Sequence, residues 1–216
     1  FGYTGKIQFA FSLRQPDFVD AGDAGNGIEC DNDASGTNAT PITRPQLSNF
    51  TMVGPNDATG TAANHNYSMR WRRRTQFVIR NSIMIGHPDA GFSMESDGTL
   101  NDYYVNGLSE FRNNLLQATT SIYRSSNNNI CTAAQIQAKA ESEGCVTLAT
   151  SAAAQLTSPF FSITPNFLPA TGSPALTGSS FTGMNPFFTS TTFRGAMGTT
   201  DWTTGWAVWD PQNKSY

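Results

Sequence analysis

The chain has 216 residues and carries 13 Lys and Arg against 16 Asp and Glu, which gives a formal net charge of -3. General nucleic-acid binding needs a dense basic surface, so this charge balance argues against that class of protein. Charged residues make up only 13% of the chain, about half of the usual quarter, and Gly, Asn, Thr, Ser and Ala take their place. This composition is typical of extracellular β-rich proteins, and no apolar run is long enough to span a bilayer.

The N-terminal segment predicts a strand over 7–13, where the side chains alternate in Ile-Gln-Phe-Ala-Phe-Ser-Leu. A stack of repeats needs a polar cap at each end, because a bare terminal strand exposes core and unpaired backbone groups. Residues 1–6 contain no such cap. We therefore expect the chain to be the C-terminal part of a longer stack, with its targeting segment upstream.

One short pattern returns at a constant step. It occupies residues 47–54, 79–86 and, more loosely, 111–118. Its asparagines, Asn49, Asn81 and Asn113, are each 32 positions apart, and self-similarity at a fixed period is the mark of a repeat architecture. We expect these asparagines to point inward, one above another, and to hydrogen-bond along the pile. In the alternative interpretation they form turns outside the core.

A second alternating segment precedes each copy of the pattern. These segments are residues 27–31, 67–71 and 91–95. Parallel strands joined by crossovers wind right-handed in nearly every known case, so the predicted fold is all-β: a right-handed parallel β-helix with about four rungs over residues 1–126. Residues 41–45, 54–66 and 97–107 are expected to be loops on one side of the coil.

Beyond residue 126 the character of the sequence changes. Thr132 to Gln135 predicts a capping box that opens a short helix through about Ser142, within an insert over 127–158. Gly144 is expected to close this helix. Residues 159–216 hold three of the four tryptophans and little periodicity, which predicts an irregular cap packed on the last rung.

The chain has three cysteines and no CxxC pair, so a zinc site is not predicted. Cys131 and Cys145 bracket the predicted helix. A disulfide between them would suit an oxidising compartment, but a straight helix of that length holds its ends about 15 Å apart, so both states remain open. Cys30 is expected to be a small buried hydrophobic residue.

Several segments resemble one known family. They are residues 5–10, 27–33, 165–175, 193–196, 201–206 and 210–213. In them the chain is similar to the pectate-lyase-like β-helix proteins of the Bacteroidota envelope. The resemblance implies a place on the bacterial surface or outside the cell, reached by export or an upstream lipid anchor. It also implies outer-membrane partners, because family members often accompany TonB-dependent receptors. It implies an activity only weakly, because one fold carries many functions.

An acidic, glycine-rich run offers a candidate calcium site. Its carboxylates are Asp20, Asp23, Glu29, Asp31 and Asp33. Calcium takes six to eight oxygen ligands, which flexible Asp, Asn and Gly loops supply. In the alternative interpretation these are turn residues that bond their own backbone. No other cofactor is predicted.

The dense basic patch is the second candidate. Arg70, Arg72 and Arg74 would share one face of a strand and could bind sulfate, phosphate or uronate groups, with Glu95 and Asp97 nearby on the next rung. The preferred interpretation is structural: these arginines form ion pairs with Glu29 or Glu95 on adjacent rungs.

Neither histidine completes a recognisable catalytic pattern. His65 and His87 both fall in predicted loops, and no Ser-His-Asp set can be assembled from spacing. We expect both to be surface residues. Glycoside hydrolysis needs two opposed carboxylates, and Glu29, Asp31, Glu95 and Asp97 could supply them. In the preferred interpretation these carboxylates only form a solvated face.

The preferred functional interpretation is a non-catalytic, surface-exposed β-helix protein that binds glycans or assembles with outer-membrane partners. One alternative is a polysaccharide lyase or hydrolase that acts in the groove of the β-helix. Another is a structural subunit of an extracellular filament. Convergence of Glu29, Asp31, Arg72 and Glu95 in a cleft with shifted pKa values would favour the enzyme, and a shallow groove lined by exposed aromatic residues would favour the binder.

Overall fold

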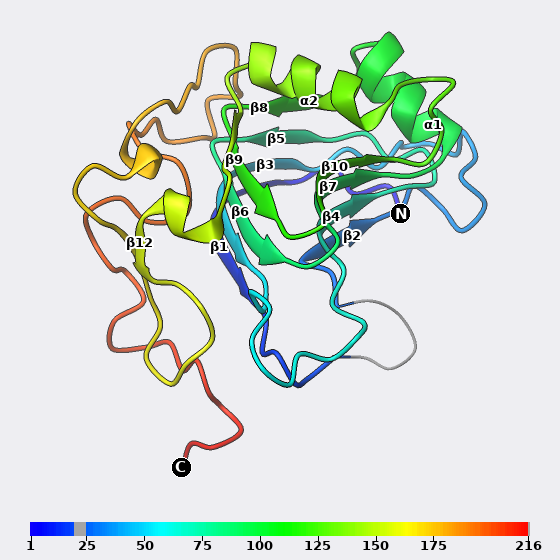
Figure 1. Cartoon of the computed structure of the whole chain (residues 1–216). Helices are drawn as coiled ribbons and strands as arrows, with labels where there is room; N and C mark the ends of the chain where they lie inside the picture. The colour runs from blue at the N-terminus through cyan, green and yellow to red at the C-terminus, as the bar shows by residue number, and fades with distance from the viewer. Residues whose placement is uncertain (20–24, 216) are drawn as a thin grey trace.

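A computed structural model describes residues 1–19 and 25–215 of the chain. Two parallel sheets, A and B, face each other, and the chain passes alternately from one to the other (Figure 1). Sheet A contains β1 (Lys6–Leu13), β3 (Gln46–Val53), β5 (Val78–Arg80), β6 (Ile83–His87), β8 (Glu110–Arg112), β9 (Leu115–Ala118) and β11 (Val146–Thr147). Sheet B contains β2 (Ile28–Cys30), β4 (Tyr67–Trp71), β7 (Ala90–Met94) and β10 (Ser121–Ser125). The predicted all-β class is confirmed, with strands at each predicted position.

The strands stack with the register that the repeat predicts. Leu47 of β3 pairs with Ile79 of β5, which pairs in turn with Phe111 of β8. In sheet B, Met69 of β4 pairs with Phe92 of β7. The backbone N–H of residue 50 bonds a side chain 32 positions further on, so the sequence period is the distance between vertical neighbours.

The repeated asparagines bend sheet A. Asn49, Asn81 and Asn113 have φ values of 58°, 55° and 56°, the left-handed region that asparagine tolerates better than most residues with a side chain. Each bend shifts the alternation by one step. As a result Ile79 and Met84 both enter the interior cluster, although strict alternation would put them on opposite faces.

The expected inward pile of asparagine amides is wrong. The Asn49 Nδ2 donates to the carbonyl of Phe193 at 3.1 Å, and that of Asn113 donates to the carbonyl of Gly178 at 3.1 Å. The amides therefore point away from the interior, because a left-handed bend turns its side chain outward. The residue after each bend takes the inner place instead: Ser82 accepts from the N–H of Phe50 at 3.1 Å.

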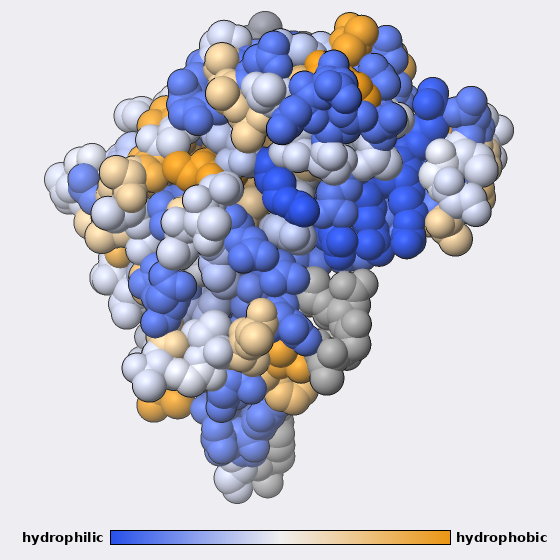
Figure 2. All heavy atoms as spheres, turned by 45° about the vertical axis from the view of Figure 1, so that its right-hand side comes forward, coloured by the Kyte–Doolittle hydropathy of each residue, from blue (hydrophilic) through white to orange (hydrophobic). Residues whose placement is uncertain are grey.

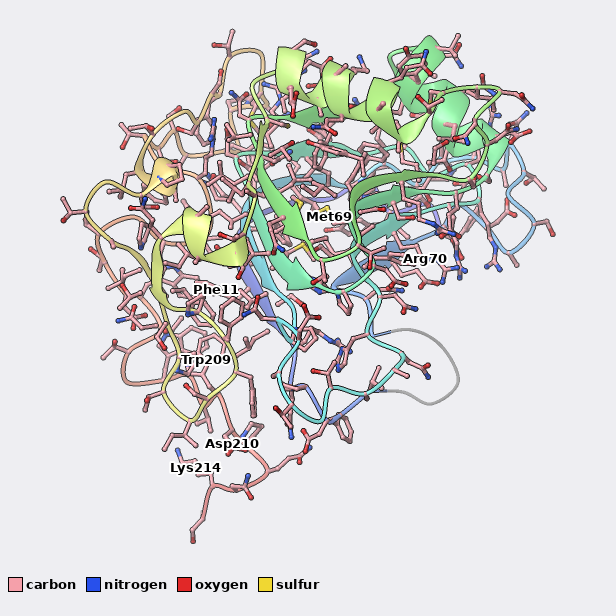
Figure 3. The ribbon with its side chains drawn as sticks, viewed as in Figure 1. Phe11, Met69, Arg70, Trp209, Asp210 and Lys214 are labelled. Carbon is pink, nitrogen blue, oxygen red and sulfur yellow. The ribbon has the colours of Figure 1, made fainter. Side chains whose placement is uncertain are left out.

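The interior between the two sheets is apolar and rich in aromatic residues. Phe92 and Phe111 stack with their ring centroids 3.9 Å apart, and Phe77 meets Trp71 at 4.8 Å. All four side chains are fully buried. Methionines fill the remaining gaps between the rings, as flexible side chains do in irregular cores; Met69 points into this space (Figure 3).

Helical segments cover one end of the stack (Figure 1). The helix α2 (Ala133–Ser142) begins with the predicted capping box, in which Thr132 and Gln135 bond each other reciprocally. The predicted loop over 97–107 is instead helical, with α1 (Asp97–Leu100) followed by a π-helical turn, η1 (Asn101–Val105). The physical reason is burial: Leu100 and Tyr103 insert into the interior cluster, which outweighs the loop-forming composition around them.

Residues beyond the helix return to the stack. The strand β11 pairs with β9, so sheet A continues into the segment predicted as an insert. It is followed by η2 (Ser151–Ala154), the antiparallel pair β12 (Leu156–Ser158) and β13 (Asn166–Pro169), and η3 (Pro174–Leu176). Within residues 1–19 and 25–215, no helix combines the length and apolar character needed to cross a membrane.

The C-terminal segment lies beside sheet A (Figure 1). The sequence predicts a cap on the last rung, so the predicted position is wrong. The N–H of Ser180 donates to Oδ1 of Asn81 at 2.8 Å, and that of Thr189 donates to Oε1 of Gln8 at 2.8 Å. The amides of Asn49 and Asn113 bond Phe193 and Gly178 of the same segment, so each asparagine bend fixes one level of it. A second apolar cluster seals the contact, with Val53, Ile83 and Met197 among its members.

Cys30, Cys131 and Cys145 are free thiols. The Cys131–Cys145 disulfide, which the sequence left open, is therefore not formed. Cys145 lies in the stack beneath Asn114, where its sulfur accepts from the Asn114 N–H at 3.4 Å. Burial raises the pKa of the Cys145 thiol to about 12, so the group stays protonated.

Candidate functional site

Charged side chains gather on the outer face of sheet B. In register across the sheet lie Glu29, Arg70, Ser93 and Arg124, one from each strand. Strand alternation explains the position: Met69 points inward, so its neighbour Arg70 points outward (Figure 3). Figure 2 shows a dense hydrophilic patch on this side of the molecule.

Ion pairs join the rungs as the preferred interpretation predicts. Arg70 lies 3.3 Å from a Glu29 oxygen and 3.0 Å from a Glu95 oxygen, and Arg124 reaches Glu95 at 2.6 Å. Arg72 bonds Asp31 at 2.8 Å and also pairs with Glu29. We name these residues, with Arg73, the sheet B ion-pair network. Because their charges satisfy one another, the arginines are not a ready anion site.

Arg74 and Asp97, which the sequence placed in the basic candidate site, lie outside the sheet B ion-pair network. Arg74 is in a left-handed conformation with φ 65° and contributes its backbone N–H to Ser96 Oγ at 3.3 Å. Asp97 begins α1 and accepts from Asn127 Nδ2 at 3.0 Å. The end of the strand at Trp71 breaks the alternation that would have kept Arg74 beside Arg70 and Arg72.

The calcium prediction finds no support in the described residues. Asp33 accepts from the N–H of Ser35 at 2.7 Å and from Thr37, a local turn of the kind the alternative interpretation describes. Glu29 and Asp31 belong to the ion-pair network, and Asp20 and Asp23 lie outside the described residues. In the part of the chain that the structure describes, no three His, Cys, Asp or Glu side chains are grouped to hold a metal ion.

Glu95 is the most heavily engaged carboxylate of the network. Desolvation raises its pKa, but the hydrogen bonds and charges of Arg70 and Arg124 outweigh this effect, and the net pKa is below the usual value. A carboxyl group that holds its proton so poorly is ill suited to act as a general acid. The arrangement joins three neighbouring strands of sheet B through one carboxylate.

Replacing Glu95 with glutamine should lower the free energy of unfolding by about 1 to 2 kcal/mol, because Arg70 and Arg124 lose a charged partner. The depressed pKa means that the contribution is present above the unfolded-state pKa and is lost as the pH falls through the folded-state value. Urea denaturation at neutral and acidic pH measures both effects. Asp89→Asn is the control, because Asp89 is exposed and its carboxylate makes no hydrogen bond or ion pair within residues 1–19 and 25–215; it should shift stability by less than about 0.5 kcal/mol. Equal effects of the two substitutions would contradict the assignment.

The expectation that both histidines are surface residues is wrong. His65 is 1% exposed and His87 is fully buried. His87 Nδ1 lies 2.7 Å from Ser68 Oγ, and burial, with the charge of Arg14, lowers the pKa of the imidazole to about 3. The buried Ser68–His87 pair is neutral and contributes to packing. The sequence did not reveal this burial because His87, predicted in a loop, is the last residue of β6, and His65 lies in a loop whose packing the local sequence does not encode.

Three tryptophans of the C-terminal segment form an aromatic surface, which the sequence did not predict as a site. The rings of Trp202 and Trp206 are nearly parallel, with centroids 5.9 Å apart and an interplanar angle of 19°. Trp206 is 67% exposed. Trp209 packs edge-on against Phe11 of β1, with centroids 5.9 Å apart (Figure 3). We call Trp202, Trp206 and Trp209 the tryptophan surface.

Hydrogen bonds hold this surface rigidly. The Trp202 indole N–H donates to the carbonyl of Ala196 at 2.8 Å, and that of Trp206 donates to the carbonyl of Trp202 at 2.7 Å. Asp201 accepts from the N–H of Thr203 at 2.8 Å and thereby forms the turn that carries Trp202. These bonds fix the orientations of the two indole rings.

Shallow hollows adjoin the tryptophan surface. One of about 420 Å³ is lined by all three tryptophans, Phe11 and Val208. A second, of about 300 Å³, lies on the other side of Trp202 and is lined by Phe9, Phe193 and Thr200. Both combine an apolar floor with hydroxyl or backbone groups, the pattern of small-ligand sites.

Comparison with known proteins identifies the larger part of the chain. Residues 1–164 match the model of a family described as a pectate-lyase like beta helix domain. The match ends before the tryptophan surface. Neither the curated proteins nor the solved structures compared with the chain gave a match.

Proposed function

The chain belongs to the pectate-lyase-like beta-helix family, and on that premise we propose that it is a carbohydrate-binding protein whose ligand rests on the tryptophan surface. The C–H face of a sugar ring packs well against an exposed aromatic ring, while its hydroxyls need polar groups at the edge. Trp206 offers such a ring, and Thr203 lines the same hollow. The exposed, nearly parallel pair of Trp202 and Trp206 is the observation that carries the proposal.

The size of the hollow also suits this ligand. About 420 Å³ is within the range of small-molecule sites, and a monosaccharide or a short stretch of a polysaccharide would fill it. Large exposed apolar groups in soluble proteins commonly mark contact surfaces. Because the aromatic rings are fixed by hydrogen bonds, binding would cost little conformational entropy.

The proposal extends to the finer architecture and the location. Parallel pairing in both sheets, with the chain passing between them at each step, supports a right-handed parallel β-helix, since such crossovers are almost always right-handed. The low charged fraction of 13% supports a place at the bacterial surface or outside the cell. Protease treatment of intact cells tests the location: rapid loss of the protein supports it, and protection contradicts it.

Trp206→Ala should weaken binding to the best oligosaccharide on a mixed array of neutral and acidic glycans by at least about tenfold, because stacking contacts of this kind act as hot spots. The measurement is titration calorimetry of the purified chain with that oligosaccharide. Phe187→Ala is the matched control, since Phe187 is also an exposed aromatic residue, at 56%, but lines neither hollow. The proposal fails if no glycan binds, or if the control and Trp206→Ala lose affinity equally.

A further inference from the structure

A third hollow, which is polar, lies between sheet A and the C-terminal segment. It measures about 280 Å³ and is lined by Arg44, Gln46, Arg80, Glu110, Met184 and Asn185. Gln46 begins β3, Arg80 ends β5 and Glu110 begins β8, so three successive rungs contribute to it. We call it the Arg44 pocket.

One charge of the pocket is already compensated. The Arg80 side chain is only 6% exposed; its Nε donates to Glu110 Oε2 at 3.0 Å and its Nη1 donates to the carbonyl of Thr182 at 2.9 Å. This buried pair ties the floor of the pocket to the C-terminal segment. Its net charge is zero, so it neither attracts nor repels an ion strongly.

The second arginine is not compensated. Arg44 Nε donates to the carbonyl of Leu108 at 3.1 Å, which orients the guanidinium. Among residues 1–19 and 25–215, no carboxylate lies within ion-pair distance of Arg44. The pocket thus carries one net positive charge and free guanidinium N–H donors.

Neutral amides complete the lining. Asn185 Oδ1 accepts from the N–H of Phe187 at 3.0 Å, so its Nδ2 donors remain for another partner. No hydrogen bond ties the Gln46 amide to the described part of the chain. The pocket is therefore lined by two neutral amides and an oriented guanidinium, and these are groups that can donate to an oxyanion.

We propose that the Arg44 pocket binds one monoanionic oxyanion group, a carboxylate or a sulfate ester. The single uncompensated charge matches one negative charge. The Nε of Arg44 is bonded to Leu108, so the two Nη atoms of the guanidinium are the ones that can present parallel N–H bonds to a pair of anionic oxygens. This site is separate from the tryptophan surface and its test does not depend on sugar binding.

The test titrates the isotope-labelled full chain with potassium acetate and, separately, potassium methyl sulfate, against potassium chloride at constant ionic strength. The Arg44 Nε–H resonance should shift and saturate, with a dissociation constant on the order of millimolar, as expected for one charged contact open to water. Saturation by acetate alone assigns the site to carboxylates, by methyl sulfate alone to sulfate esters, and by both to either group. A shift that fails to saturate with either anion, or that chloride reproduces, overturns the proposal.

Arg44→Gln should weaken binding about tenfold or more. Arg73→Gln is the control, because Arg73 is a half-exposed arginine of the sheet B ion-pair network that does not line the pocket, and this variant should bind as the unmodified chain does. Equal loss in both variants would show a general charge effect and overturn the proposal. If Arg44→Gln still binds the glycan, the result at the Arg44 pocket is independent of the result at the tryptophan surface.

Discussion

Asn81→Ala should lower the free energy of unfolding by about 3 kcal/mol, a large effect for a polar side chain. Part of the loss is conformational, because alanine in the left-handed region costs about 1 to 2 kcal/mol, and Asn81 has φ 55°. The rest arises because the Ser180 N–H, now bonded to Asn81 Oδ1 at 2.8 Å, loses its partner. Equilibrium urea denaturation measures the change.

Asn81→Gly separates the two causes. Glycine adopts positive φ without strain, so this variant should lose only the hydrogen bonds and be clearly more stable than Asn81→Ala. Asn113→Ala should be milder, since Asn113 is partly exposed and its amide bonds a single carbonyl, that of Gly178. Equal stability of the Asn81→Ala and Asn81→Gly variants would contradict a role of Asn81 in stabilising the left-handed bend.

Acidification from pH 7 to pH 5 should cost the folded chain about 2 kcal/mol through His87 alone. The buried imidazole has a pKa of about 3, against 6.5 for an ordinary histidine, so between these values the unfolded state binds the additional proton. Stability is therefore fully present above about pH 6.5 and declines as the pH falls. Burial and Arg14 also lower the pKa of His65, which acts in the same direction.

The check is a pair of urea titrations, at pH 7 and at pH 5, on the unmodified chain and on His87→Gln. The substitution removes the titrating group, so its stability should change much less between the two pH values, whatever its absolute stability. His65→Gln is the companion variant and should keep the part of the decline that belongs to His87. An unchanged decline in His87→Gln would contradict the assignment.

The ion pairs of sheet B show how far register arguments reach. Once the alternating segments that precede each copy of the repeat placed Glu29, Arg70 and Glu95 on adjacent rungs, Coulomb attraction between neighbouring outward side chains made their pairing predictable. Arg74 escaped the argument because β4 ends at Trp71, and alternation holds only while the backbone stays extended. The same limit applies to Asn81, where one left-handed residue reversed the faces that simple alternation assigns.

The sequence by itself determined the local and periodic features of this protein: strands of period two, a repeat of 32 residues and the capping box at Thr132. These depend on neighbours in the chain or on a regular step, which the order of residues encodes directly. Only the tertiary structure decided that the C-terminal segment lies beside sheet A, that Trp202 and Trp206 form one surface, and that His87 is buried. It also decided that Arg44 has no carboxylate partner among residues 1–19 and 25–215. Each of these depends on contacts between segments that share no periodicity, so their burial and charge environment arise only when the chain is packed.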